Sequence, residues 1–146
     1  TPSKVTGSFA YVFGAQGLIS FDYSRKDYSS TKFKPENDYT NVNNNINNML
    51  TDASTYRIGG EYKHKEFSFR GGYRFEESPY KNGVTVGDLT GYSFGIGYNF
   101  GNTKLDVTYD QSNRTSETPL YNVGLTDVAL IDRTNSNLTL SLSFNI

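Results

Sequence analysis

Acidic and basic side chains are the residues of this chain best suited to chemistry, because nucleophiles and nitrogen or sulfur ligands are nearly absent. The 146 residues include one His, His64, and no Cys. A nucleophilic triad needs a base beside its nucleophile, and nitrogen-rich or thiolate metal sites need several His or Cys. His64 stands next to Lys65 in a predicted tight turn, where we expect it to be solvent-exposed. The sequence therefore predicts no catalytic residue, and we do not expect an enzyme.

Two pairs of carboxylates remain as candidates, Glu76 with Glu77 and Asp106 with Asp110. Such pairs can transfer protons or bind calcium, but no loop has the spaced Asp/Asn, Gly and Glu pattern of a calcium site. We expect no metal and no cofactor. Four glycines resemble a nucleotide-binding fingerprint only superficially, because their spacing is wrong, and we expect them to make room on a polar sheet face: Gly91, Gly95, Gly97 and Gly101.

Polar and apolar residues alternate along seven segments, which is the spacing of half-buried β-strands. The alternation is most regular at the end of the chain, where Leu138, Leu140, Leu142, Phe144 and Ile146 share one face. The sequence predicts an all-β domain over residues 1–146, with strands at approximately 4–14, 17–27, 54–63, 66–76, 89–100, 103–111 and 136–146.

Short turns alternate with long loops, which are predicted at approximately 28–53, 77–88 and 112–135. In the first loop, Val42, Ile46, Met49 and Leu50 recur at helical spacing and suggest a short amphipathic helix. The alternative is a polar loop in which these few apolar residues pack on one another, and the many Asn residues favour it.

The two faces of the predicted strands differ in a way that suits a membrane. Charged residues share one face: Arg57, Glu61, Arg70, Arg74, Lys104 and Asp106. Across the ladder, Glu61 and Arg70 are expected to meet diagonally. On the other face, aromatic residues gather toward both strand ends: Tyr23, Tyr56, Tyr73, Tyr92 and Tyr109 at the loop end, and Tyr11, Phe13, Tyr62, Tyr98, Phe100 and Phe144 at the turn end. Aromatic bands of this kind are typical of outer-membrane barrels.

A mean hydropathy of −0.60 leaves no window apolar enough for a membrane helix, whereas a barrel strand needs only every second residue to be apolar. The sequence therefore favours an antiparallel transmembrane β-barrel over a soluble two-sheet sandwich, which stays the alternative. Bacterial single-chain barrels have an even number of strands. We therefore expect these seven strands to be the C-terminal portion of a longer barrel, preceded by an odd number of strands. The missing N-terminal part is expected to come from the same protein, either in one chain or as a separate chain.

Several segments resemble a known family when they are taken together: Gly7–Gly14 with Gly17–Tyr23, Tyr56–Lys63, Gly72–Tyr80 and Gly95–Gly101. In combination, over nearly the whole chain, they resemble the C-terminal half of FadL/TodX-type transporters of hydrophobic compounds, as found in Bacteroidetes-like bacteria. The resemblance implies a fourteen-stranded barrel whose hatch belongs to the N-terminal half. One departure is Ile146, because the family usually ends on an aromatic residue.

The resemblance implies a location in the bacterial outer membrane and passive transport of hydrophobic small molecules, either long-chain fatty-acid-like or aromatic. The expected partners are outer-membrane lipid and the hydrophobic ligand. In the lumen, Arg57, Arg70, Arg74 and Lys104 are expected to meet an anionic head group, with ion-pair networks as the alternative.

Outside the membrane, apolar loop residues are expected to gather ligand, with packing within the loops as the alternative: Val42, Ile46, Met49, Leu50, Leu120 and Leu125. The second candidate function is a FadL-like barrel that serves as a binding or structural subunit of a larger envelope or secretion complex, with other envelope proteins as partners. The net charge of −1 and the dispersed basic residues argue against nucleic acid as a partner.

Overall fold

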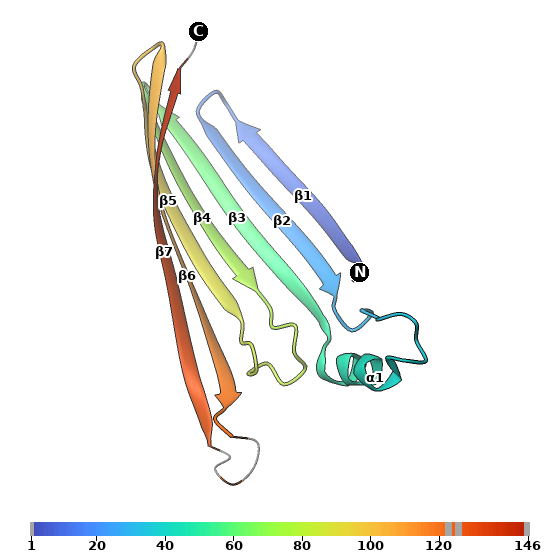
Figure 1. Ribbon diagram of the computed structural model, residues 1–146. Helices are drawn as coiled ribbons and strands as arrows, with labels where there is room; N and C mark the ends of the chain where they lie inside the picture. The colour runs from blue at the N-terminus through green and yellow to red at the C-terminus, as the bar shows by residue number, and fades with distance from the viewer. Residues whose placement is uncertain (1, 122–123, 125–126, 145–146) are drawn as a thin grey trace.

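The described residues of the computed structural model, 2–121, 124 and 127–144, form one antiparallel β-sheet and one short helix (Figure 1). The elements are β1 (Lys4–Phe13), β2 (Gly17–Asp27), α1 (Thr40–Met49), β3 (Asp52–His64), β4 (Phe67–Glu76), β5 (Leu89–Asn99), β6 (Thr103–Pro119) and β7 (Val128–Phe144). The alternating pattern thus gives the strands it predicts, and the all-β prediction is confirmed.

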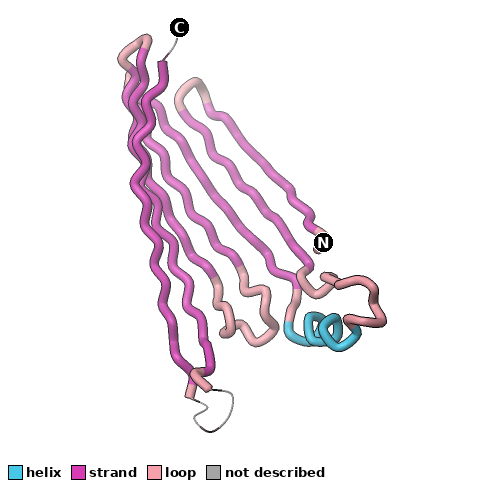
Figure 2. Tube along the Cα trace, in the orientation of Figure 1, coloured by secondary structure: helices cyan, strands magenta, loops and turns pink. Residues whose placement is uncertain are grey.

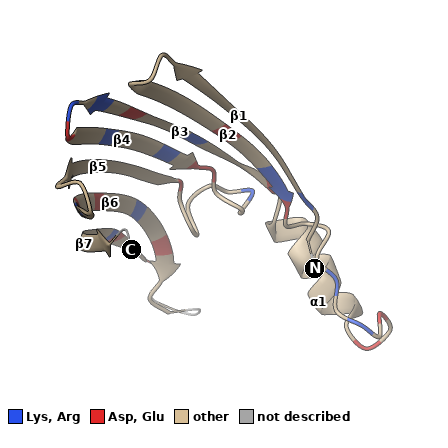
Figure 3. Ribbon diagram, turned by 90° about the horizontal axis from the view of Figure 1, so that it is seen from above, with Lys and Arg blue, Asp and Glu red and all other residues tan. Residues whose placement is uncertain are grey.

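Each strand pairs with its neighbour in the sequence, so the order across the sheet runs from β1 to β7 without a crossover. Within the described residues this is a single layer, so the two-sheet sandwich is not formed. Figure 3 shows the sheet bent into an open arc, with β1 and β7 as its two edges. The last strand pairs with β6 on one side, as predicted.

Short turns lie at one end of the sheet and longer connections at the other, as the sequence predicts (Figure 2). Residues 14–16, 65–66 and 100–102 make the turns. The last of them contains Gly101 at a φ of 95°, a conformation that side chains disfavour. None of the described segments forms a helix long and apolar enough to cross a membrane.

The third predicted loop, at 112–135, is wrong over most of its length. β6 runs on to Pro119 and β7 begins at Val128, and their pairing is continuous from Ser112↔Asn135 to Pro119↔Val128. These extensions carry many Ser, Thr, Asn and charged residues and are largely exposed. The extension of β6 is polar on both faces, and the extension of β7 begins with the apolar run Val128–Ile131, so polar–apolar alternation disappears although the ladder continues.

Helix α1 confirms the helix hypothesis for the first loop, and the favoured alternative of a polar loop is wrong there. The Asn43 side chain both accepts from the Phe33 backbone N–H (2.8 Å) and donates to the Phe33 carbonyl (3.1 Å). At the other end, the Lys81 N–H donates to the Met49 carbonyl at 2.9 Å. Asn side chains and the β4–β5 loop thus stabilise a helix that propensity alone disfavours.

The apolar face of the sheet is uncovered. Ala53 is the only buried apolar residue in the described part of the chain, whereas Phe9 is 63% exposed, Phe94 63% and Leu140 69%. A sheet normally buries one face against another layer of structure. Within the described residues, no second layer covers this face.

Aromatic rings form two bands on this apolar face. The loop-end aromatic band includes Tyr23 and Tyr56, whose ring centres are 5.3 Å apart, together with Tyr73, Phe75, Tyr92 and Tyr109. The turn-end aromatic band includes Phe67, Tyr98 and Phe100. The ring centres of Phe67 and Tyr98 are 4.8 Å apart, and those of Tyr98 and Phe100 are 4.6 Å apart. Leucine, isoleucine, valine and phenylalanine occupy the rows between the bands; the phenylalanines there include Phe21 in β2 and Phe94 in β5.

Candidate functional site

The candidate site is the polar face of the sheet, opposite the aromatic bands. All six charged residues predicted to share a face do so: Arg57, Glu61, Arg70, Arg74, Lys104 and Asp106. This face is the concave one, since it holds a hollow and allows side chains to meet across an intervening strand. The curvature brings charges from β3, β4 and β6 toward one another, with β5 between the last two.

Four of these residues and Lys63 form an ion network across β3 to β6. Arg70 Nε lies 2.9 Å from Glu61 Oε2, and Arg70 Nη1 lies 2.5 Å from Asp106 Oδ1. Lys63 approaches Glu61 at 3.3 Å, and Lys104 approaches Asp106 at 3.4 Å. Glu61 and Arg70 are direct partners in the register, so the predicted diagonal meeting is wrong. The network neutralises most of the charge of this region internally.

Glycines in β5 make the contact between Arg70 and Asp106 possible. These residues belong to β4 and β6, and the strand between them carries Gly95 and Gly97 on the same face. A Cβ atom at Gly97 would overlap the Asp106 carboxylate, and one at Gly95 would lie 3.1 Å from the Thr108 Oγ1. The predicted role of the glycines in making room is confirmed for these two, whereas Gly101 lies in a turn instead.

Replacing Gly97 with alanine is expected to break the contact between Arg70 and Asp106, because Asp106 must rotate away from the new methyl group. We expect a loss of about 1 kcal/mol in the free energy of unfolding, the size of a good partly exposed ion pair. Chemical denaturation of the protein in lipid vesicles measures it. In an Asp106→Asn background the same substitution should have little further effect; additive losses would show that Gly97 does not act through this pair.

A hollow of about 360 Å³ lies beside the ion network on the polar face. Arg57 and Arg74 line it and are directly opposite each other in β3 and β4. Among the described residues neither arginine lies in an ion pair. The structure therefore divides the basic residues predicted to meet a head group: Arg70 and Lys104 are paired with protein carboxylates, and Arg57 and Arg74 are not.

Arg114 is a charged residue of this face that sequence reasoning missed. Its Nη2 lies 2.9 Å from Glu76 Oε1, again across β5, while its buried Nε has no hydrogen-bond partner in the structure. The residue was hidden because it falls in the stretch predicted as a loop. The one signal in that stretch is its two strand-forming threonines, Thr115 and Thr118, because no polar–apolar alternation marks it.

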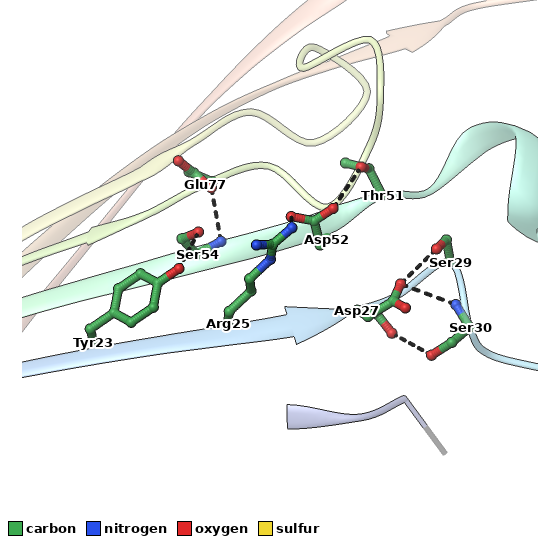
Figure 4. Close-up of polar contacts among 9 residues, drawn as sticks. All are labelled: Tyr23, Arg25, Asp27, Ser29, Ser30, Thr51, Asp52, Ser54 and Glu77. Atoms are coloured by element: carbon green, nitrogen blue, oxygen red, sulfur yellow. Dashed lines mark hydrogen bonds and ion pairs between the residues drawn. The ribbon is translucent and has the colours of Figure 1, made fainter. Parts of the chain in front are cut away.

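Polar contacts fix the loop ends of β2, β3 and β4 (Figure 4). Arg25 Nη2 lies 2.7 Å from Asp52 Oδ2, and the Ser54 N–H donates to Glu77 Oε2 at 2.9 Å. The Ser29 hydroxyl donates to Asp27 Oδ1 at 2.6 Å and lowers the pKa of the Asp27 carboxyl below its ordinary value. These groups lie beyond the loop-end aromatic band and begin the connections that carry α1.

The apolar loop residues predicted to gather ligand do not form one cluster. Val42, Ile46 and Met49 lie on α1, and Leu50 follows it and bridges to Tyr80. Leu120 lies 56% exposed just after β6, and Figure 1 places α1 and the end of β6 on opposite sides of the loop end. Leu125 lies outside the described residues. The loop end thus carries separate apolar groups.

In the described ranges, no three His, Cys, Asp or Glu residues are placed to hold a metal ion. His64 is exposed at the end of β3, as predicted. The polar face offers charge, hydrogen bonds and space. Comparison of the sequence with protein-family models and with curated proteins finds no match.

Proposed function

We propose that this chain is part of a bacterial outer-membrane β-barrel that passes hydrophobic small molecules, long-chain fatty-acid-like or aromatic, without chemical change. The observation that carries the proposal is the contrast between the two faces of a single-layer sheet. One face is apolar, uncovered and bounded by aromatic bands, and the other is concave, polar and rich in glycine. Lipid outside and a ligand path inside account for both faces.

Lipid is the layer that fits the apolar face. Tyrosine and phenylalanine rings concentrate where a bilayer changes from hydrocarbon to head groups, and aliphatic residues occupy the space between. Strands β1, β2, β4 and β5 contain 10 or 11 residues. A tilted strand needs about 9–11 residues to cross the hydrocarbon region. A soluble partner layer gives no reason for two aromatic bands.

The two unpaired edges of the sheet are the reason to propose further strands. β1 and β7 each leave one row of backbone N–H and C=O groups without a ladder in the described structure. β7 has no charged residue from Thr134 to Phe144, so nothing protects this edge against pairing. Unpaired backbone groups are costly in lipid, and barrels avoid them by closure. We propose that further strands of the same protein close the barrel, and the FadL/TodX resemblance suggests fourteen in all.

The features of the polar face favour an open path for a ligand over a lumen filled by side chains. Gly59, Gly72 and Gly91 line the hollow and have no side chains to fill it. The ion network next to it keeps its charges paired with one another. A ligand with a long apolar part can therefore pass without displacing water from many unpaired charges.

Replacing Gly72 with tryptophan is expected to fill the hollow and slow ligand entry. We expect uptake of a fluorescent long-chain fatty acid to fall about tenfold, which corresponds to about 1.4 kcal/mol of lost favourable interaction. The assay uses the complete protein in outer-membrane vesicles. Gly7→Trp is the matched control, because Gly7 lies on the apolar face beside Tyr23 and an added Cβ there meets nothing within 4 Å.

One outcome would contradict the proposed transport, and a separate one would contradict the role of the hollow. If the intact protein neither binds nor admits long-chain or aromatic ligands, passive transport is wrong. If it also co-purifies stably with other envelope proteins, the function is that of a structural subunit. Equal uptake by Gly72→Trp and Gly7→Trp would show that the hollow is not on the ligand path.

A further inference from the structure

We propose that Arg57 and Arg74 form a binding site for the anionic group of an amphiphile, with its alkyl chain lying over Ala10, Val12 and Leu18. The proposal rests on the proposed function and adds a ligand class and a position on the polar face. Two observations carry it: a pair of opposed arginines without protein counter-ions, and an apolar strip on an otherwise polar face.

The arginine pair is an unusual arrangement for a sheet. Arg57 and Arg74 are register partners, and like charges directly opposite each other destabilise a ladder. Arg70 lies on the same face of β4, four residues before Arg74, and has two carboxylates within 3 Å. No described carboxylate lies within 4.0 Å of Arg57 or Arg74. An anion between the two guanidinium groups would remove this repulsion.

The surroundings leave space for that anion. Gly59, Gly72 and Gly91 line the same hollow of about 360 Å³, and Ser20 and Ser93 add hydroxyl groups to it. Guanidinium groups donate in a planar fork that matches carboxylate, sulfonate and phosphate oxygens. The site therefore offers donors from two strands and no bulky side chain on the floor between β3 and β5.

Two carboxylates, Asp22 and Asp110, line the same hollow and compete with the ligand. Asp22 lies directly opposite Arg57 in β2, without an ion pair in the structure, and is the nearer competitor in the register. Asp110, on β6, accepts a hydrogen bond from the Asn137 Nδ2 at 3.0 Å and is separated from Arg74 by β5. Removal of the Asp22 charge is therefore expected to strengthen anion binding.

An apolar strip lies on the polar face, one to two rows from the arginines toward the turn end. Val12 and Leu18 are register partners in β1 and β2, and Ala10 lies in the adjoining row opposite Ser20. Val12 is 61% exposed and Leu18 is 36% exposed. An alkyl chain that leaves the arginine pair along β2 would cover these side chains, so head and tail of one amphiphile match two neighbouring surfaces.

The test compares dodecanoate with dodecanol, which has the same chain length and no charge. Binding is measured on the complete protein in an uncharged detergent. We expect the wild type to bind dodecanoate about tenfold more tightly, as a charge-assisted fork would give. Arg57→Gln/Arg74→Gln should remove this preference, Asp22→Asn should increase it, and Leu18→Asn should weaken both ligands equally. Arg25→Gln, outside the hollow, should change nothing.

The outcomes separate this site from the proposed function. Equal binding of both ligands by the wild type, or a preference that survives in the double arginine variant, would overturn the site while transport stands. Displacement of dodecanoate by acetate at equal concentration would show a bare-anion site and overturn the amphiphile assignment. If neither ligand binds, it is the proposed function that fails.

Discussion

Replacing Leu140 with arginine is expected to destabilise the folded barrel by about 2–4 kcal/mol, the cost of a lipid-facing charge near the bilayer midplane. Leu140 is 69% exposed, pairs with Val107, and lies between Leu138 and Leu142 on the apolar face. If lipid covers this face, the guanidinium group must either enter hydrocarbon or distort the bilayer. Water over the same face would make the substitution nearly neutral.

Ser141→Arg is the matched control, because it adds the same side chain one residue later on the opposite face. Ser141 is the register partner of Asp106, so the new arginine meets water and a carboxylate. We expect a change below 1 kcal/mol, as for partly exposed ion pairs. The folded fraction in lipid vesicles is followed by circular dichroism during denaturant titration, since the chain has no Trp to report unfolding. Similar losses for the two variants would refute the assignment of faces.

Strand positions could be predicted from the sequence wherever one face is apolar. β2 has the predicted bounds, and β1, β4 and β5 differ by one residue at an end, because alternation marks them directly and Gly-containing turns follow β1 and β5. β6 and β7 are each eight residues longer than predicted at the loop end. There both faces carry polar residues, and the pairing depends on the partner strand rather than on any pattern in one segment.

The polar face was predictable as a list of residues but not as a set of contacts. Period two puts Arg70 and Asp106 on the same face, but their contact depends on sheet curvature and on Gly97 between them. In the same way, nothing in the sequence distinguishes Arg57 and Arg74 from Arg70. The distinction comes from the contacts: Arg70 pairs with its register partner Glu61, whereas Asp22, the register partner of Arg57 in β2, forms no ion pair with it.

Replacing Arg70 with methionine is expected to destabilise the protein by about 2 kcal/mol, because Glu61 and Asp106 lose their shared counter-ion. Removal of one partner from a fully buried pair costs about 3–5 kcal/mol. The loss here should be smaller, since the Arg70 side chain is 32% exposed and Lys63 and Lys104 remain near the two carboxylates. Denaturant titration in vesicles measures this loss as well.

A neutral network separates lost pairing from lost packing. In the triple variant Glu61→Gln/Arg70→Met/Asp106→Asn, no unpaired carboxylate is left, and methionine keeps much of the apolar stem of arginine. We expect its stability to return to within about 1 kcal/mol of the wild type, as happens when whole ion networks are replaced by neutral groups. If the triple variant is as unstable as Arg70→Met, packing of the arginine side chain stabilises these strands, and the charges contribute little.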